Sequence, residues 1–167
     1  MSFSKVNLLD LNLNPFKMIG KQWYLLTAGN NEGYNTMTAS WGQMGEIWGV
    51  PTFTCLVRPS RYTYEFVEKN DIFTVSFFGD EQKKALSFCG SHSGREYDKV
   101  KETGLTPVFI DGTTAFDEAN LVFICKKIYE DKIEKDLFLD KSKLSFYDSD
   151  AFHKIYIGEI IAAYKKD

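Results

Sequence analysis

The residues best suited to chemistry in this chain are its three arginines, which stand at two loop-to-helix junctions. Arg58 and Arg61 lie in the segment RPSRYT, and Arg95 follows the segment SHSG. Arginine carries a planar fork of donors that fits a phosphate, and the N–H groups at the start of a helix also attract anions. Because the chain otherwise uses lysine, 17 times, for positive charge, this placement favours a phosphate-bearing ligand. The alternative is helix capping with ordinary surface charge.

A second suggestive stretch is the octapeptide NTMTASWG at residues 35–42, in which small hydroxyl residues alternate with apolar ones before a tryptophan. Small side chains allow a flat ligand to approach the backbone, whose N–H and C=O groups can then bind the polar edge of the ligand. A plain edge strand is the alternative interpretation. The stretch indicates a binding site only together with other evidence.

The common catalytic motifs are absent. The sequence contains no P-loop, no glycine-rich dinucleotide fingerprint, no HExxH, no GxSxG and no CxxC. Ser91 and His92 are sequence neighbours, whereas the members of a hydrolase triad come from distant segments, so a loop before a helix is the preferred interpretation. The three cysteines lack metal-ligand spacing, and we expect reduced thiols and no metal site.

Composition bounds the class of protein. The chain has 167 residues, 44% of them hydrophobic and 26% charged, which predicts one globular domain spanning residues 1–167. A net charge of −3 argues against nucleic-acid binding, and no apolar run approaches the roughly 18 residues of a membrane span. The N-terminus lacks the apolar core of a signal peptide. We therefore expect a cytoplasmic protein that binds neither nucleic acid nor membrane.

The elements that must position these residues are mostly strands. Short connections favour antiparallel pairing, and a bulge is expected at Gly158. The pattern predicts a mainly β, antiparallel barrel of six or seven strands with small helices on its rim. The strand segments are rich in β-branched and aromatic residues or alternate with period 2, and they cover residues 22–28, 36–41, 52–57, 71–78, 119–129 and 155–164.

Three short helices fit between these strands. Each begins after a residue that can cap a helix or after a loop, and each ends near asparagine or glycine. They are expected at residues 61–70 after Ser60, at residues 81–89 between Asp80 and Gly90, and at residues 95–103 before Gly104.

Five segments of the chain carry a family resemblance. They are NTMTASWG (35–42), TFTCLVRPSRYTYE (52–65), IFTVSF (72–77), SGREYDKVKETGLTP (93–107) and HKIYIGEI (153–160). Together they resemble the flavin reductase-like family, the FMN-binding split barrels that include flavoredoxin, in the family's order and roughly its spacing. The resemblance implies an antiparallel, Greek-key, FMN-binding split β-barrel with a few short peripheral helices.

The resemblance also implies a cofactor site. In such proteins the NTMTASW segment runs along the isoalloxazine ring, while Arg61 and Thr63 would hold the phosphate and Asp98 would orient Arg95 or Lys99. No catalytic side chain is certain, although a histidine approaches the flavin at the place of His153. The implied FMN-binding residues are Asn35, Thr36, Met37, Thr38, Ala39, Ser40, Trp41, Cys55, Leu56, Val57, Arg58, Arg61, Thr63, Ser91, Ser93, Gly94, Arg95, Lys99 and His153.

The implied activity is transfer of a hydride or electrons from NAD(P)H through FMN to a small acceptor. The nicotinamide would stack on an open ring face bordered by Trp41, Tyr62 or His153. Two alternatives stay open: a flavoredoxin-like electron carrier reduced by a redox protein partner, and a barrel without flavin.

The resemblance carries two further expectations. Family members are generally homodimers with FMN near the interface, so a homodimer is expected. Flavoredoxin-like proteins continue past the last matched strand with an aromatic contact to the flavin, whereas this chain ends seven residues after Ile160. We expect the aromatic stretch 138–152 to replace that contact.

Overall fold

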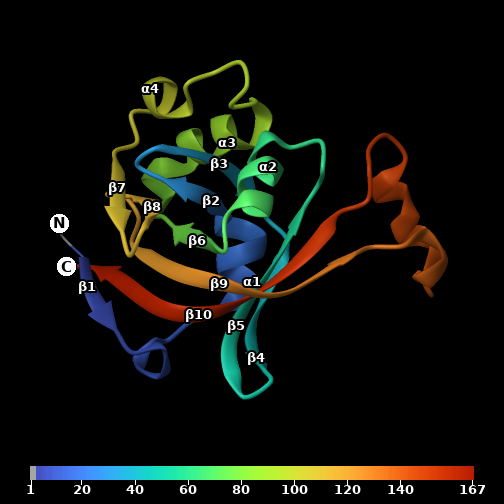
Figure 1. The fold of residues 1–167 in the computed structure, drawn as a ribbon, viewed down its shortest axis with the longest axis horizontal. Helices are drawn as coiled ribbons and strands as arrows, with labels where there is room; N and C mark the ends of the chain where they lie inside the picture. The colour runs from blue at the N-terminus through green and yellow to red at the C-terminus, as the bar shows by residue number, and fades with distance from the viewer. Residues whose placement is uncertain (1–2) are drawn as a thin grey trace.

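One large antiparallel sheet dominates the computed structural model, which describes residues 3–167 (Figure 1). Within those residues the sheet has eight strands in the order β3-β2-β6-β9-β10-β5-β4, with β1 paired to β10. No ladder joins β3 to β4 in the described part of the chain, so the barrel is split rather than closed. The predicted mainly β, antiparallel fold is confirmed. The strands are β1 (Phe3–Val6), β2 (Tyr24–Asn30), β3 (Gly33–Ala39), β4 (Gly42–Ile47), β5 (Val50–Val57), β6 (Ile72–Phe77), β9 (Leu121–Lys132) and β10 (Lys154–Lys166), with a separate hairpin of β7 (Pro107–Ile110) and β8 (Thr113–Phe116).

Strand β10 joins the two halves of the sheet. One of its edges pairs with β9, and the other pairs first with β5 and then with β1. The register with β9 shifts between Ile157 and Gly158, so the predicted irregularity is present, but the extra residue is Ile128 on β9 and Gly158 lies opposite the bulge. A Cβ on Gly158 would lie only 2.7 Å from the ring of Phe73, so close packing at the bulge also requires glycine.

The core follows from the alternation of side chains along the strands. On β5, Phe53, Cys55 and Val57 are fully buried, whereas the intervening side chains are partly exposed. The ring of Phe53 packs edge-on against Tyr24, with centroids 5.1 Å apart, which is a favoured aromatic geometry. A second buried cluster lies between the sheet, α3 and the β7–β8 hairpin, with Leu86 on α3 among its members.

The three predicted helices are present with different boundaries. They are α2 (Tyr62–Lys69), α3 (Lys83–Ser91) and α4 (Lys99–Thr103). The prediction that Ser60 caps α2 is wrong: Arg61 occupies the N-cap, and the hydroxyl of Ser60 donates instead to Asp150 at 3.0 Å. The tertiary partner on a distant segment outcompetes local capping.

The second and third helices also differ at their ends. Gly90 lies inside α3, whose C-cap is His92, and the predicted Asp80 cap instead begins a short 3₁₀ helix, Asp80–Gln82. Helix α4 begins at Lys99 rather than residue 95 because the side chain of Asp98 caps it, accepting from the N–H of Lys101. Gly104 ends α4 with a φ of 73°, as predicted.

Several elements were not predicted. Besides β1, β4 and the β7–β8 hairpin, they are α1 (Pro15–Lys17), which continues into a π-helical turn, Met18–Gln22, and a projection between β9 and β10. We call residues 133–153 the arm; it carries the 3₁₀ helices Lys135–Leu137 and Lys141–Tyr147 and extends to the right in Figure 1. Within residues 3–167, no helix has the length and hydrophobicity needed to cross a membrane.

A charged cluster ties α2 to the sheet beneath it. Lys154, which is 8% exposed, donates to Glu68 at 2.7 Å and to Glu130 at 2.9 Å, and the hydroxyl of Tyr156 also donates to Glu68. Burial raises the pKa of Glu68, but the hydrogen bonds from Lys154 and Tyr156 outweigh it, and the pKa lies below its usual value. Removing one member would leave a buried charge poorly compensated.

We predict that Glu68→Gln lowers the free energy of unfolding by about 1–3 kcal/mol at neutral pH, because Lys154 loses a carboxylate partner. Glu130→Gln is the matched control and should cost less than about 1 kcal/mol, since Glu130 is more exposed. Urea unfolding followed by circular dichroism measures both. Folding lowers the pKa of Glu68, so the difference between wild type and Glu68→Gln should shrink as the pH falls through the carboxylate range. Equal losses in the two variants would contradict this assignment.

Candidate functional site

Two adjoining cavities lie where β3, β5, α2 and the start of β10 meet. The narrow cavity, of about 190 Å³, borders the end of β3, and the polar cavity, of about 540 Å³, lies between α2 and the loop after α3. Met37, Arg58 and Arg61 line both cavities, so the two adjoin and can be considered as one site. The polar end collects hydroxyl groups and cations, and the narrow end collects Trp41 and His153.

Arg61 is the cation best placed to receive an anion. It precedes the first turn of α2, and its Nη1 donates to the carbonyl of Gly90 on α3 at 2.7 Å. Among the residues that the structure describes, Arg61 forms no ion pair. One nitrogen therefore holds the guanidinium, which lines both cavities and forms no ion pair with a described residue.

The other two arginines have structural partners. Arg58 donates to the carbonyls of Phe146 at 2.7 Å and Ala151 at 3.1 Å, both on the arm. Arg95 forms an ion pair with Glu65 at 2.5 Å, with both side chains near half exposure. The sequence placed all three arginines on one ligand, but the structure leaves Arg61 as the least committed of them.

A buried amide joins β3 to α2 within the polar cavity. The Nδ2 atom of Asn35 donates to the hydroxyl of Thr63 at 2.7 Å. Gly94 packs directly against this pair, and a Cβ at that position would collide with the Oδ1 atom of Asn35. The loop can close over the cavity only because residue 94 has no side chain.

Lys99 is part of the wall of the polar cavity, where it joins β3 to α3. Its ammonium donates to the carbonyls of Thr36 on β3 at 2.7 Å and Cys89 on α3 at 2.8 Å. Burial lowers the pKa of Lys99 to about 8, with a smaller raising effect from Cys89 and a smaller lowering effect from Arg61. The expectation that Asp98 orients Lys99 or Arg95 is wrong, because Asp98 caps α4 and backbone carbonyls hold Lys99.

Aromatic rings enclose the narrow cavity. The ring of Trp41 lies 5.2 Å from that of His153 and 5.2 Å from that of Phe146 on the arm. Nδ1 of His153 is hydrogen-bonded to the hydroxyl of Tyr147 at 2.9 Å. Burial, and then the charge of Arg58, lower the pKa of His153 to about 4, so the imidazole is neutral at pH 7.

Most predicted site residues line these two cavities, but three do not. Cys55 and Val57 are fully buried in the core because side chains alternate along β5, so that only Leu56 between them reaches the narrow cavity. Thr36 points inward, where its hydroxyl is bonded to Thr27 at 2.8 Å. Whether the remaining residues contact FMN stays a prediction. Those lining the cavities are Asn35, Met37, Thr38, Ala39, Ser40, Trp41, Leu56, Arg58, Arg61, Thr63, Ser91, Ser93, Gly94, Arg95, Lys99 and His153.

The second junction differs from the predicted helix start. Ser91 is the last residue of α3, and the next helix begins only at Lys99, so no helix starts between Ser91 and Arg95. Instead, Ser91, Ser93 and Arg95 come from the end of α3 and the following loop. At the first junction, by contrast, the start of α2 lines the polar cavity.

Sequence reasoning missed the contribution of the arm to the polar cavity. Ser149 and Asp150 line it, together with His92 and Glu96 from the loop after α3. The only signal was the aromatic stretch 138–152, which does lie beside the site, with Phe146 against Trp41. A contact between this stretch and a flavin stays a prediction.

The fold has close counterparts among solved structures. An FMN-binding protein of Thermus thermophilus superposes with a TM-score of 0.67 at 22% identity, covering 86% of this chain and 70% of the other. Flavoredoxin of Methanosarcina acetivorans gives 0.68 at 24% identity, covering 97% and 77%. A Shewanella frigidimarina protein described as having a split barrel domain gives 0.70 at 17% identity, covering 88% and 68%. At these identities the likeness shows the fold.

The family of the chain is shown by a match to a protein-family model, not by these superpositions. A search of curated proteins finds no significant match. The model of the flavin reductase like domain matches residues 16–167, which is nearly the whole chain and includes both cavities. The chain therefore belongs to the flavin reductase-like family.

Proposed function

We propose that this protein is an FMN-dependent oxidoreductase that takes a hydride from NADH or NADPH and passes it, or its electrons, through FMN to a small acceptor. One observation carries the proposal: the narrow and polar cavities adjoin at Arg61, with small β3 residues in the narrow cavity and hydroxyl residues in the polar cavity. A flat ring joined to a phosphate has this same division of chemistry. Family membership supports the same cofactor.

The residues present fit FMN. Arg61 lines the polar cavity and has no ion-pair partner among the described residues, and Thr63, Ser91 and Ser93 line the same space. The loop can approach this closely only with glycine at residue 94, because any Cβ there would collide with Asn35. Charge-assisted bonds from Arg61 to the phosphate would supply most of the affinity at this end.

The bound flavin would supply the hydride chemistry, and the side chains would bind and orient it. Thr38, Ala39 and Ser40 offer a low wall along which a flat ring can lie close to the backbone of β3. Trp41, which lines the narrow cavity and packs against Phe146, would border the ring and exclude water from it. Neutral His153 would contribute an uncharged imidazole, held in place by Tyr147.

We propose two further properties of the protein. It forms a homodimer, for which the exposed apolar side chains of Leu137 and Leu139 on the arm are suitable contacts. Sedimentation equilibrium tests the homodimer, and a monomer at micromolar concentration would contradict it. The protein also works in the cytoplasm, which agrees with three cysteines that are all free and buried.

Anaerobic stopped-flow absorbance tests the main proposal. Mixing the FMN-loaded protein with NADH or NADPH should bleach the oxidised-flavin band near 450 nm. Reduction by a ferredoxin-type donor but by neither pyridine nucleotide would indicate a flavoredoxin-like electron carrier instead. Protein that neither carries nor takes up FMN would exclude both and favour a barrel without flavin.

We predict that Arg61→Ala weakens FMN binding by about 1–3 kcal/mol, because a charge-assisted hydrogen bond to the phosphate is lost. Arg95→Ala is the matched control and should have a smaller effect, since Arg95 is already paired with Glu65. Quenching of FMN fluorescence on titration with protein measures both dissociation constants. Equal effects, or none from Arg61→Ala, would move the phosphate away from Arg61.

The lowered pKa of His153 gives a pH prediction for the protein without flavin. Tryptophan fluorescence should fall as the pH decreases through about 4, because protonated imidazole quenches the adjacent indole of Trp41. His153→Gln should lack this step, and far-UV circular dichroism distinguishes it from acid unfolding. A midpoint near the ordinary histidine value of about 6.5 would contradict the burial of His153.

A further inference from the structure

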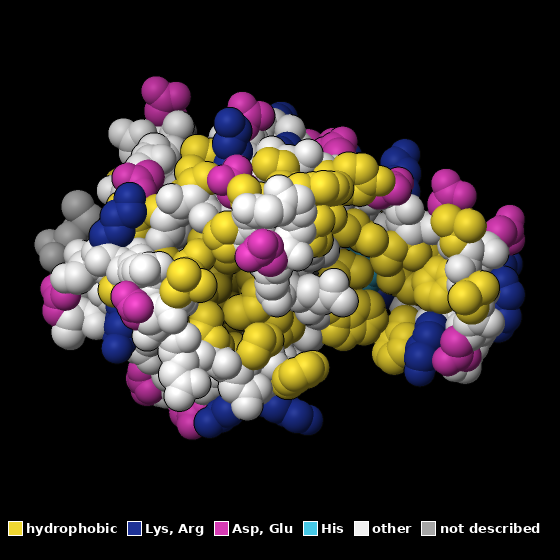
Figure 2. All heavy atoms as spheres, turned by 90° about the horizontal axis from the view of Figure 1, so that it is seen from below, with side chains coloured by type: hydrophobic (Ala, Val, Ile, Leu, Met, Phe, Trp, Pro, Cys, Tyr) yellow, Lys and Arg dark blue, Asp and Glu magenta, His cyan; other side chains and the backbone are white. Residues whose placement is uncertain are grey.

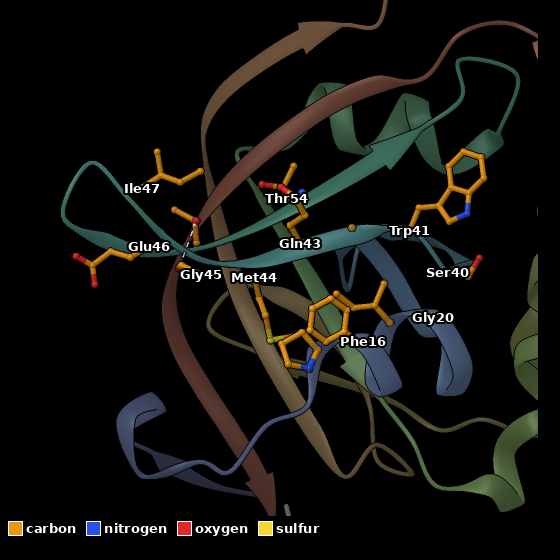
Figure 3. A pocket seen from close by; sticks show the side chains of 14 residues that line it. Phe16, Gly20, Ser40, Trp41, Gln43, Met44, Gly45, Glu46, Ile47 and Thr54 are labelled. Atoms are coloured by element: carbon orange, nitrogen blue, oxygen red, sulfur yellow. Dashed lines mark hydrogen bonds between the residues drawn. The ribbon is translucent and has the colours of Figure 1, made fainter. Parts of the chain in front are cut away.

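A third cavity adjoins the proposed flavin site on its apolar side. It has a volume of about 850 Å³ and lies between α1, the π-helical turn, β4 and β5. Ser40 and Trp41 line both this cavity and the narrow cavity, so the two share a wall. Figure 3 shows Trp41 at one end of the space, with Phe16 and Met44 beneath β4.

The chemistry of this cavity is the reverse of the polar cavity. Ile19, Met44 and Ile47 contribute apolar surface, and Phe16, which is 90% exposed, stands at the mouth. Among its described lining residues the single charged side chain is Glu46, which points outward from the hairpin in Figure 3. Figure 2 shows hydrophobic side chains gathered across the middle of this face and in the hollow beside the arm.

We propose that this cavity binds the electron acceptor, and that the acceptor is an uncharged, planar, largely apolar compound of the quinone type. The inference rests on the proposed function. The volume falls within the range of small-molecule sites, and such sites combine an apolar lining with a few polar groups that fix orientation. Gln43 and Thr54 are the polar groups available here to a carbonyl oxygen.

The charges around the three cavities indicate which ligand each one can bind. A pyridine dinucleotide carries a diphosphate, and the cations that could receive it, Arg58 and Arg61, lie on the other cavities and not on this one. Glu46 at the rim would further repel an anion. An anionic acceptor therefore gains nothing in this cavity, whereas a neutral aromatic one gains the burial of its surface.

The exchange balances without a protein-derived reductant. The reduced pyridine nucleotide loses a hydride, and the quinone gains two electrons and two protons, one of which comes from solvent. The C–H bond of the nicotinamide that carries the hydride is broken, and the two C=O groups of the quinone become hydroxyl groups. Trp41, which separates the two cavities, would set the distance between flavin and acceptor.

Methionine methyl NMR on the protein without flavin locates the acceptor directly. Met44 lines this cavity, Met37 lines the narrow and polar cavities, and Met18 lines none of the three. Titration with 1,4-naphthoquinone should shift the methyl signal of Met44 and leave that of Met18 in place. The sulfonate 1,4-naphthoquinone-2-sulfonate is the charged control and should bind at least tenfold more weakly.

Variants make the assignment specific. Met44→Glu should weaken naphthoquinone binding at least tenfold, whereas Ile161→Glu, a partly exposed position on β10 that does not line the cavity, should leave it unchanged. Because no flavin is present, failure here is distinct from failure of flavin reduction by NAD(P)H. A shift of Met37 without Met44, or equal binding of the sulfonate, would overturn the proposal. So would a dimer that Met44→Glu dissociates while naphthoquinone fails to bind, because a second copy would then fill the cavity.

Discussion

The pairing of β10 with both β5 and β9 is the constraint on which the rest of the structure depends. Lys154 at the start of β10 lies opposite Val57 at the end of β5, so His153 and Arg58, which flank that pair, meet at the same edge. On the other side of β5, Gly42 lies opposite Cys55, which brings Trp41 to the same place. The narrow cavity is thus a consequence of register: three strand ends coincide there.

The charges of the site divide into structural and available groups. In a chain of net charge −3, an anion site has to be local, and the three arginines are not equivalent within it. Arg58 holds the arm and Arg95 is paired with Glu65, which leaves Arg61 to face the cavity. Lys99 is part of the wall, where its buried ammonium binds β3 and α3 together through their carbonyls. Of the four described cations that line the polar cavity, three hold parts of the fold together and Arg61 is the one available to bind an anion.

The long, periodic strands and the positions of the three helices could be predicted from sequence, because burial alone explains them. Strand β4 could not, since GQMGEI has no run of β-branched residues and depends on pairing with β5. The cap at Ser60 was mispredicted because its hydroxyl has a partner at Asp150, far along the chain. Cys55 and Val57 were assigned with Leu56 as a contiguous segment, although a strand can present only alternate side chains to one ligand. The local sequence pattern therefore predicted most strands and helices, whereas contacts between distant segments determine the details of the site.

Arg58 binds the arm through the carbonyl oxygens of Phe146 and Ala151 and through the carboxylate of Asp150, at 3.7 Å. Asp150 also accepts from the hydroxyl of Ser60, so the anchorage depends on the side chain at residue 150. Residue 146 is different, because its carbonyl is the anchor and its ring is what the arm presents to Trp41. Every residue has a carbonyl, so substitutions at residue 146 can retune the same scaffold toward different small molecules while the arm stays attached.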